Sequence, residues 1–474
     1  MSRLVSILRR WLAPLGAGLP EAYLVGGAVR DHLLGREAKD IDLMCADPQA
    51  LAQALESVHD LTLVPFLKKP HAPCLRAVNR TDTRDFIDLV PIYGSGVEDD
   101  LKRRDFTINA MAIAINIGGA LGELVDPLGG QRDLRDRRIR AAGPDAMTSD
   151  PLRVIRAVRF SAELGFEIDA TTRRLMSEAS AGIATVAAER IARELFLTLK
   201  QPGSTPPVRL LDGTGALQVI FPEIAPMRGC SQNEHHHLDV WKHSLEAIEK
   251  LEALLSALTE QFEPAAGRLR ANLGRENRLA VLKLAALLHE VGRPGPQSVA
   301  PGTDRVTFYR PDTPASTIAA CIADRLRFSA PDKELFARLI EEHMHVIDLS
   351  GPDVRPGTIL RWFRRLGEDM VLLILLAMAD AMATRGPESP EAEREGRLRW
   401  CRDTIISYYT DIEDRLVRKP LIGGRDLMAI GVPPGPGMGA ILQAVREAQD
   451  EETVKDRDQA LALAAELTRR IRLE

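Results

Sequence analysis

Two aspartates stand two positions apart in the chain, at Asp40 and Asp42. Residues i and i+2 of a strand face the same side of a sheet, so these carboxylates would repel each other unless a cation lay between them. Mg2+ prefers carboxylate oxygens, and paired metal ions can clamp the attacking and leaving oxygens of a phosphoryl transfer. The pair therefore indicates a metal site for phosphoryl transfer; the alternative is an exposed polar strand face.

A glycine pair, Gly26-Gly27, lies between a short apolar run and a helical stretch. Glycines let backbone N–H groups approach a ligand closely, and the N-terminus of the following helix offers partial positive charge to a phosphate. Arg30, one turn into that helix, could bind an anion with two hydrogen bonds. A glycine turn often does no more than redirect the chain. Placed ahead of Asp40 and Asp42, it favours the metal site over the polar strand face.

A third carboxylate is needed if two metal ions are to be held, and the sequence offers Asp85 and Asp88. Asp88 lies inside the apolar run 86–90, where an acidic side chain needs a partner. Asp85 has the position of a residue at the end of a strand. We expect Asp88 to be the third catalytic carboxylate.

The elements that must position these residues divide the chain into a mixed part and a helical part. Residues 20–140 combine short β-like runs with helical stretches and with turns at Gly94-Ser95-Gly96, Asp126-Pro127 and Gly129-Gly130. From Asp150 onward helical periods dominate, as in Leu152, Ile155, Val158 and Leu164 and in Ile191, Leu195 and Leu199. The predicted fold class is α+β, with a small α/β head followed by helices.

Length and composition set the outer limits. The chain of 474 residues predicts about three or four domains. A net charge of −5 excludes a uniformly basic nucleic-acid coat, although it allows a local basic patch. The five cysteines form no C-x-x-C pair, which argues against a disulfide framework and favours a reducing compartment, so we expect a cytoplasmic protein. No apolar run is long enough to span a bilayer, and we expect no membrane partner.

Several motifs resemble one family, the class II tRNA nucleotidyltransferases and poly(A) polymerases, which include bacterial CCA-adding enzymes. The resemblance rests on the glycine turn with Arg30 and the paired aspartates, and it continues over most of the chain. Its most specific part is the run R-R-D-F-T-I-N-A-M at 103–111, and the other matching segments are 126–130, 150–160, 419–428, 433–436 and 448–449.

This resemblance implies a head of the DNA polymerase β type that adds C, C and A to the 3′ end of tRNA from CTP and ATP, without a nucleic-acid template. Asp40 and Asp42 would bind Mg2+. Gly26, Gly27 and Arg30 would hold the triphosphate, and Arg104, Asp105 and Asn109 would shape the ribose and phosphate side of the pocket. Phosphoryl transfer needs positioning and charge neutralisation more than covalent chemistry, which agrees with these residue types.

The resemblance also implies that Asp150 and Arg153 read the incoming base with hydrogen bonds. They are three residues apart and would be neighbours on a helix; the alternative is an ordinary surface salt bridge. The commonest family pattern has an acidic residue where this chain has Ser149. Arg153, Arg156 and Arg159 would form a basic stripe suited to triphosphate and RNA backbone, or else a solvated helix face.

The connector between Asp88 and Arg103 has only fourteen residues, 89–102. Full CCA-adding relatives usually carry a longer flexible loop here, which helps the pocket to switch from C to A, and relatives that add only two C residues lack it. CC-only addition is therefore a serious alternative. A-only addition and poly(A) synthesis are less favoured.

Residues 233–244 and 287–292 resemble an HD domain, a fold that binds metal through His and Asp and hydrolyses phosphoesters. The H-D pair reads His289-Glu290, and the aromatic-x-Gly-His run reads Phe308-Tyr309-Arg310-Pro311. His243 and Asp380 remain candidate ligands. Because metal sites tolerate lost ligands poorly, we expect a degenerate HD-like scaffold, with a working phosphohydrolase as the alternative.

We therefore predict four parts: a catalytic head (1–145), a helical neck for base recognition and RNA binding (146–225), a helical HD-like body (226–395) and a helical, tRNA-binding tail (396–474). The body and the tail would grip tRNA by shape and phosphate contacts.

Overall fold

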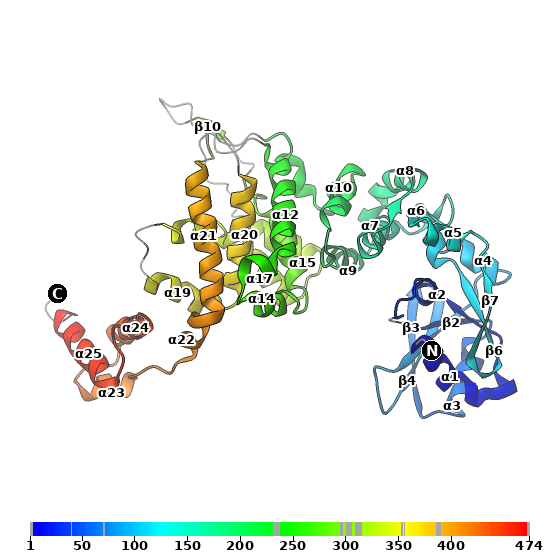
Figure 1. Cartoon of the computed structure of the whole chain (residues 1–474), viewed down its shortest axis with the longest axis horizontal. Coiled ribbons are helices and arrows are strands. Elements are labelled where there is room, and N and C mark those ends of the chain that lie inside the picture. The colour runs from blue at the N-terminus through cyan, green and yellow to red at the C-terminus, as the bar shows by residue number, and fades with distance from the viewer. Residues whose placement is uncertain are drawn as a thin grey trace. The chain divides into compact units, whose positions relative to one another are not determined.

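The computed structural model describes residues 3–38, 40–69, 72–230, 238–293, 297–299, 306–308, 315–351, 354, 356–384 and 390–471. The chain forms two compact units (Figure 1). One comprises Met1–Thr198 and Pro206–Ile220, and the other comprises Leu199–Thr205 and Phe221–Glu474. The predicted head and most of the predicted neck lie in the first unit. Residues 199–205 and 221–225 of the predicted neck lie in the second unit, with the predicted body and tail.

The head is built on one mixed sheet of seven strands, in the order β3-β4-β5-β2-β1-β6-β7. Of the pairings in this sheet, β2 with β5 is parallel and the others are antiparallel. The predicted α+β class is confirmed. The strands are β1 (Ala22–Val25), β2 (Asp42–Cys45), β3 (Leu61–Lys69), β4 (Ala72–Asn79), β5 (Phe86–Pro91), β6 (Ala112–Asn116) and β7 (Ala120–Val125).

The register of the central strands brings the predicted catalytic residues together. Val25 pairs with Asp42, and Asp42 pairs with Asp88 across the parallel β2–β5 ladder. Residues directly opposite each other share a face of the sheet, so Asp42 and Asp88 project from the same face. On this face an apolar cluster that includes Met44, Val90 and Leu101 seats the helix α4 (Val97–Lys102).

Short helices surround the sheet. The helix α2 (Gly27–Leu33) follows β1 directly, and α3 (Pro48–Glu56) packs on β4 and β5. The amphipathic helix α1 (Arg3–Leu12) buries Leu4, Leu8, Trp11 and Leu12 and contacts β7. A one-turn helix, η2 (Thr107–Asn109), holds the core of the R-R-D-F-T-I-N motif and packs on α5 (Gly130–Arg135).

The neck is helical apart from β9 (Glu167–Ile168), which pairs in parallel with β8 (Arg138–Ile139). Its central helix is α7 (Leu152–Leu164), and all the apolar positions predicted from the helical period are buried there and in α9 (Ala188–Leu199). The other neck helices are α6 (Ala146–Ser149), α8 (Ala170–Ala179), α10 (Thr205–Gly213) and α11 (Ala216–Ile220).

The body is a helical bundle around α20 (Asp369–Ala383), which is buried along most of its length. It contacts α12 (Val240–Ser256), α15 (Arg278–Leu288), α17 (Ala330–Glu342) and α21 (Glu391–Ser407). The apolar run 370–378 is thus buried at the centre of this bundle, and none of the described helices has the length and apolar character needed to cross a bilayer. The remaining body elements are α13 (Leu258–Phe262), α14 (Ala266–Leu273), β10 (Gln297–Val299), β11 (Val306–Phe308), α16 (Ala315–Arg325), α18 (His345–Leu349), α19 (Pro356–Leu366) and α22 (Glu413–Val417).

The tail has a small apolar core of its own between α23 (Gly424–Ala429), α24 (Pro436–Asp450) and α25 (Arg457–Ile471). The boundary predicted at residue 396 lies inside α21, which packs on α20. The residues of the tail's apolar core begin later in the chain, at Leu421.

Candidate active site

Three aspartates of the head act on one guanidinium, that of Arg76. Asp40 is exposed just before β2, Asp42 is half-buried at the first position of β2, and Asp88 is buried in β5. The pKa of Arg76, on β4, is raised first by its hydrogen bonds to Asp88 and then by the charges of Asp88, Asp40 and Asp42. The structure therefore places the predicted metal-binding pair and the predicted third carboxylate in one acidic region.

Asp88 has the partner that a buried carboxylate requires. Nε and Nη2 of Arg76 donate to its two oxygens at 2.7 and 3.0 Å. Asp85 lies elsewhere, at the strand end, where Arg10 and Trp11 of α1 donate to it. The geometry favours Asp88 over Asp85 as the acid beside Asp42. Sequence reasoning missed Arg76, because its antiparallel pairing with Asp88 across β4 and β5 is a tertiary contact.

The glycine turn lies directly beside Asp42. Gly26 has φ +72°, a conformation that favours glycine, and ends β1 at the start of α2. A Cβ atom at Gly26 would lie 3.2 Å from Nη1 of Arg104 and 3.9 Å from Oδ2 of Asp42. At Gly27 the nearest neighbour of such an atom would be Nη2 of Arg30, at 3.7 Å. Backbone amide, guanidinium and carboxylate thus converge at this turn.

Arg30 is buried and bonded inside the protein. It donates to Asp31 at 2.7 and 2.9 Å and to Oδ1 of Asn109 at 3.1 Å. Asn109 in turn donates to Oδ1 of Asp105 at 3.2 Å. These three predicted nucleotide-binding residues therefore form one hydrogen-bonded framework behind the glycine turn.

The framework continues into the neck. Arg156 donates twice to Oδ2 of Asp105, at 2.6 and 3.0 Å, and its other Nη donates to Glu194 of α9 at 3.0 Å. Burial opposes ionisation of Asp105, but the Arg156 guanidinium outweighs it and holds the pKa of that carboxyl well below its usual range. Arg159 donates to Glu194 and to Glu163. Two arginines of the predicted basic stripe, Arg156 and Arg159, are therefore paired with carboxylates, and both contact Glu194, a residue that sequence reasoning missed.

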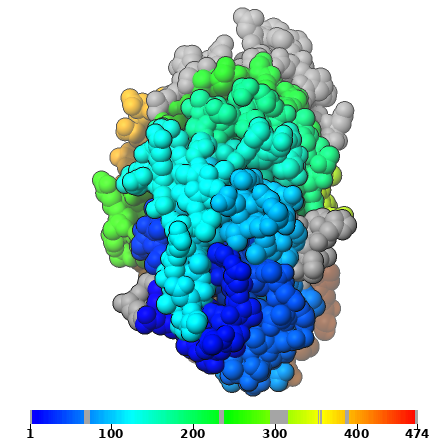
Figure 2. All heavy atoms as spheres, turned by 90° about the vertical axis from the view of Figure 1, so that its right-hand side faces the viewer, coloured from blue at the N-terminus to red at the C-terminus, as the bar shows by residue number. Residues whose placement is uncertain are grey.

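Asp150 and Arg153 stand at the start of α7, but each side chain has another partner. Arg153 is buried and donates to the carbonyls of Arg103 (2.8 Å), Arg104 (3.1 Å) and Ala146 (3.0 Å). Its burial lowers the pKa of its guanidinium. Asp150 forms an ion pair with Arg190 at 2.9 Å. Arg153 thus lies against the R-R-D segment of the head, and the head and the neck form one continuous surface (Figure 2).

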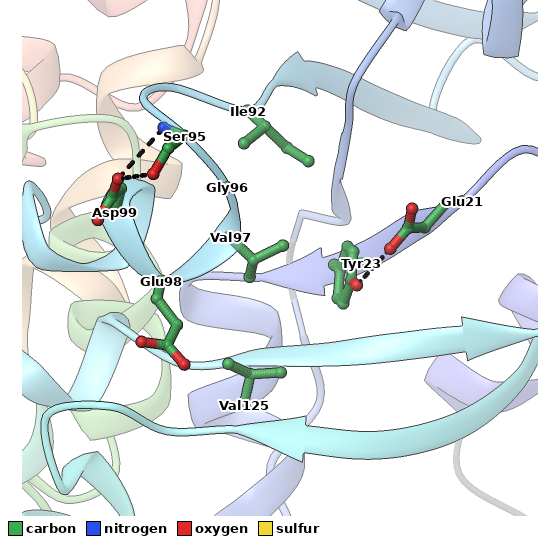
Figure 3. Close-up of a pocket in the computed structure, with 9 residues that line it drawn as sticks. All are labelled: Glu21, Tyr23, Ile92, Ser95, Gly96, Val97, Glu98, Asp99 and Val125. Carbon is green, nitrogen blue, oxygen red and sulfur yellow. Dashed lines mark hydrogen bonds between the residues drawn. The ribbon is translucent and has the colours of Figure 1, made fainter.

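The short connector is a compact turn followed by α4. It borders a cavity of about 530 Å3, whose floor includes Tyr23 and Val125 of the sheet (Figure 3). Two acidic groups on the rim are bonded: the hydroxyl of Tyr23 donates to Glu21, and Ser95 donates to Asp99. Tyr23 and Val25 are two residues apart on β1, so this cavity opens on the sheet face that bears Asp42.

A second acidic group is buried in the body. Ligand atoms of His243, His289, Glu290 and Asp380 all lie within 4.8 Å of one another, and no other such group is found in the part of the chain that the structure describes. Nε2 of His243 lies 2.9 Å from Oδ1 of Asp380, and Nε2 of His289 lies 3.5 Å from the same oxygen and 3.7 Å from Glu290. Two imidazoles and two carboxylates form a donor set that suits a divalent metal. Residues 233–237 and 309–311, also named in the HD-like pattern, lie outside the described residues.

Comparisons with known proteins agree with this arrangement. Residues 22–140 match the family model described as the poly A polymerase head domain. Residues 165–228 match a second model, described as the probable RNA and SrmB-binding site of polymerase A. These ranges cover the seven-stranded sheet and much of the neck.

Relatives extend the similarity to nearly the whole chain. The A-adding tRNA nucleotidyltransferase of Deinococcus radiodurans is 33% identical over 92% of this chain and 93% of its own length. The CC-adding tRNA nucleotidyltransferase of Thermus thermophilus is 32% identical over 93% of this chain and 92% of its own. The Thermotoga maritima CCA-adding enzyme, solved in complex with tRNA, has a TM-score of 0.66 at 22% identity over 97% and 94% of the two chains. This last likeness establishes a common fold.

Proposed function

Because this chain belongs to the class II tRNA nucleotidyltransferase and poly(A) polymerase family, a family of nucleotidyltransferases, we propose that it adds C and A residues to the 3′ end of tRNA. Its substrates are CTP, ATP and tRNA, and the reaction releases pyrophosphate. The observation that carries the proposal is the convergence of Asp42, the Gly26 backbone and Arg104 on one face of the sheet.

Asp40 and Asp42 would hold Mg2+, because they present carboxylate oxygens at a place that solvent and substrate can reach. When bound, Mg2+ supplies positive charge at the triphosphate and at the attacking 3′-hydroxyl oxygen. The backbone of Gly26 and Gly27 cradles the triphosphate at the start of α2. Arg104 adds positive charge beside the same turn, where negative charge develops during transfer.

The neighbouring polar residues have a framework role in this proposal. Arg30, Asp105 and Asn109 hold the head side of the pocket, and Arg156 and Arg159 hold α7 against it. Asp150 and Arg153, at the start of α7, read the base of the incoming nucleotide. Arg153 donates hydrogen bonds to the carbonyls of residues 103 and 104, so the orientation of its guanidinium depends on that segment.

Relatives of this chain differ in which nucleotides they add. Two relatives that align with more than nine-tenths of this chain are named for a single part of the reaction, CC addition or A addition. The connector 89–102 is short, as expected for a CC-adding enzyme. These observations favour CC-only addition as the second candidate, ahead of A-only addition.

The test supplies purified protein with two tRNA substrates, one ending at the discriminator base and one ending in CC. Each receives CTP alone, ATP alone or both, and the products are sized to one nucleotide. Growth by three residues with both nucleotides supports full CCA addition. Arrest after two C residues supports CC-only addition, and growth of the CC-ending substrate alone supports A-only addition. No growth of either substrate would refute the proposal.

The buried body cluster supports a candidate of another class, a metal phosphohydrolase, because two histidines and two carboxylates lie together there. Turnover of a phosphomonoester or a cyclic nucleotide, in the presence of Mn2+ or Ni2+, would support it. The matched control is His289→Ala, which should remove that turnover and leave nucleotide addition unchanged.

A further inference from the structure

We propose that Asp100 is a positioning residue that holds Arg104 against the glycine turn and so sets the affinity for the incoming nucleotide. This inference rests on the proposed function, and Asp100 is not among the site residues predicted from the sequence. Asp100 lies near the end of α4, four residues before Arg104, on the segment that links the short connector to the R-R-D-F-T-I-N motif.

Both oxygens of Asp100 are occupied. Oδ2 accepts the backbone N–H of Tyr93 at 3.2 Å, and Oδ1 accepts Nε of Arg104 at 3.1 Å. Nη2 of Arg104 lies 3.0 Å from the same Oδ1. The side chain of Asp100 is 9% exposed and that of Arg104 is 21% exposed, so the ion pair is largely removed from water. Low exposure makes such a charged hydrogen bond stronger and its loss more costly.

Asp100 thereby decides which way the guanidinium of Arg104 faces. Its Nε–Nη2 edge is turned to the carboxylate, and its Nη1 is directed to the glycine turn, 3.2 Å from where a Cβ of Gly26 would lie. Oδ2 of Asp42 is 3.9 Å from that same point. Arg104 therefore stands at the place where a triphosphate would meet both the turn and the metal-binding aspartate. A guanidinium released from Asp100 would have many more orientations to sample before it could bind a phosphate.

The same segment also binds Arg153, the arginine proposed to read the base. Arg153 donates to the backbone carbonyls of Arg103 and Arg104, at 2.8 and 3.1 Å. A shift of residues 103 and 104 would move Arg153 along with Arg104. Asp100 thus fixes a segment on which a triphosphate contact and a base contact both depend.

The connector closes on this carboxylate. Tyr93 lies seven residues before Asp100, and its N–H bond draws the turn after β5 onto α4, which Leu101 seats in the apolar cluster of the sheet. In this chain, the short connector and Asp100 together hold residues 100–104 in a fixed position. Asp100 is for that reason expected to affect discrimination between CTP and ATP as well as affinity.

Asp99 provides a matched control on the same helix. It accepts the N–H and the hydroxyl of Ser95 and lies near Lys102, and its side chain is 42% exposed. Asp99 carries the same charge as Asp100 and lies on the same helix, but it is more exposed and does not contact Arg104.

The experiment compares Asp100→Asn, Asp99→Asn and Asp100→Glu with the wild-type chain. Equilibrium dialysis measures the Kd of CTP and of ATP with Mg2+ present, and single-nucleotide addition to tRNA gives kcat and KM. We expect Asp100→Asn to raise the Kd and the KM about 10-fold, as for loss of one charged hydrogen bond, with a smaller change in kcat. Asp99→Asn should stay within about 2-fold of the wild type, and Asp100→Glu should recover part of the affinity because it restores the charge.

Equal nucleotide affinity of the Asp100→Asn and Asp99→Asn variants would overturn the inference. If Asp100→Asn fails to fold, Arg104→Lys replaces it, since a lysine keeps the charge but cannot present a guanidinium edge to Asp100. An unchanged Kd in Arg104→Lys would equally overturn the inference. A wild-type chain that binds CTP or ATP but extends no tRNA would refute the proposed function, while the Kd comparison would still decide the role of Asp100.

Discussion

The head and the body each gather carboxylates and basic groups, but the two places differ in what their carboxylates bond. In the head, Asp40 is exposed and Asp42 is half-buried beside a glycine turn. In the body, Asp380 is buried and bonded to His243. Burial opposes ionisation of Asp380, yet hydrogen bonds from His243 and His289 keep its pKa well below its usual range. In the head, Asp40 and Asp42 therefore present accessible carboxylate oxygens, whereas in the body Asp380 is bonded within the bundle.

This difference in accessibility explains why we propose different roles for the two acidic clusters. A substrate of the size of tRNA must bring its 3′ end to the reacting groups, which requires acids at a surface. The body cluster is enclosed by α12, α15 and α20, and Glu290 also forms an ion pair with Arg293. The buried cluster could stabilise the helical bundle from within or bind a small enclosed ion.

The largest expected effect is at Asp42. Asp42→Asn keeps the size of the side chain and removes the charge that would hold Mg2+ in the head. We expect the rate of nucleotide addition to fall about 1000-fold, equivalent to roughly 4 kcal/mol of transition-state stabilisation. Affinity for tRNA, measured by filter binding, should change less than about 3-fold, because phosphate and shape contacts supply it.

The matched control for this prediction is Asp380→Asn in the body. It removes a buried aspartate of the same kind, and addition at a temperature well below unfolding should remain within about 2-fold of the wild type. Equal loss of activity in both variants would refute the assignment of catalysis to the head alone.

Asp105→Asn should give the next largest effect, on stability. It removes a buried carboxylate that Arg156 contacts twice, so the free energy of unfolding should fall by about 3 kcal/mol at pH 7. The pKa of Asp105 is lower in the folded state than in the unfolded state, so its contribution is complete above about pH 4. The contribution is lost as the pH falls below that value towards the depressed folded pKa.

Urea unfolding at pH 7, 5 and 3 tests this sign. The difference between wild type and Asp105→Asn should be the same at pH 7 and 5 and smaller at pH 3. A difference that grows as the pH falls would contradict the ion pair. Glu163→Gln is the control, because Arg159 keeps Glu194 when Glu163 loses its charge.

The glycine turn predicts a third effect. Gly26→Ala would place a Cβ 3.2 Å from Arg104 at a φ of +72°, so both strain and displacement of the guanidinium are expected. The rate of nucleotide addition should fall about 30-fold, equivalent to roughly 2 kcal/mol. Gly35→Ala is the matched control, since Gly35 has φ +67° but no atom within 4 Å of the added Cβ. Equal loss in the two variants would assign the effect to backbone strain alone.

The sequence predicted the local parts of this site and missed its long-range parts. Alternation placed Asp88 among apolar neighbours, and the helical period identified the buried positions of α7 and α9 correctly. Arg76 could not be predicted as the partner of Asp88, because strand pairing across β4 and β5 decides it. Glu194 lies 38 residues from Arg156 in the chain, and no local pattern encodes such a contact.

The same limit applies to the arginines of the neck. Spacing by three correctly put Arg153, Arg156 and Arg159 along one helix, but it could not reveal that carbonyls and carboxylates from other elements receive their side chains. Periodicity reports which face a residue occupies, and partners that come from distant elements depend on how those elements pack.

The smallest expected effect is the stability change of Asp380→Asn, and it sharpens the contrast between the two regions. Burial opposes the positive charge on His289, whereas its hydrogen bond to Asp380 raises its pKa. This imidazole can therefore become neutral when the carboxylate is lost, unlike an arginine. The free energy of unfolding should fall by about 1–2 kcal/mol, the cost of weakened buried hydrogen bonds. Thermal unfolding, followed by circular dichroism, should show a lower Tm. If chelation with EDTA lowered the Tm of the wild type but not that of Asp380→Asn, the cluster would hold a metal ion, and the body would be a second metal centre.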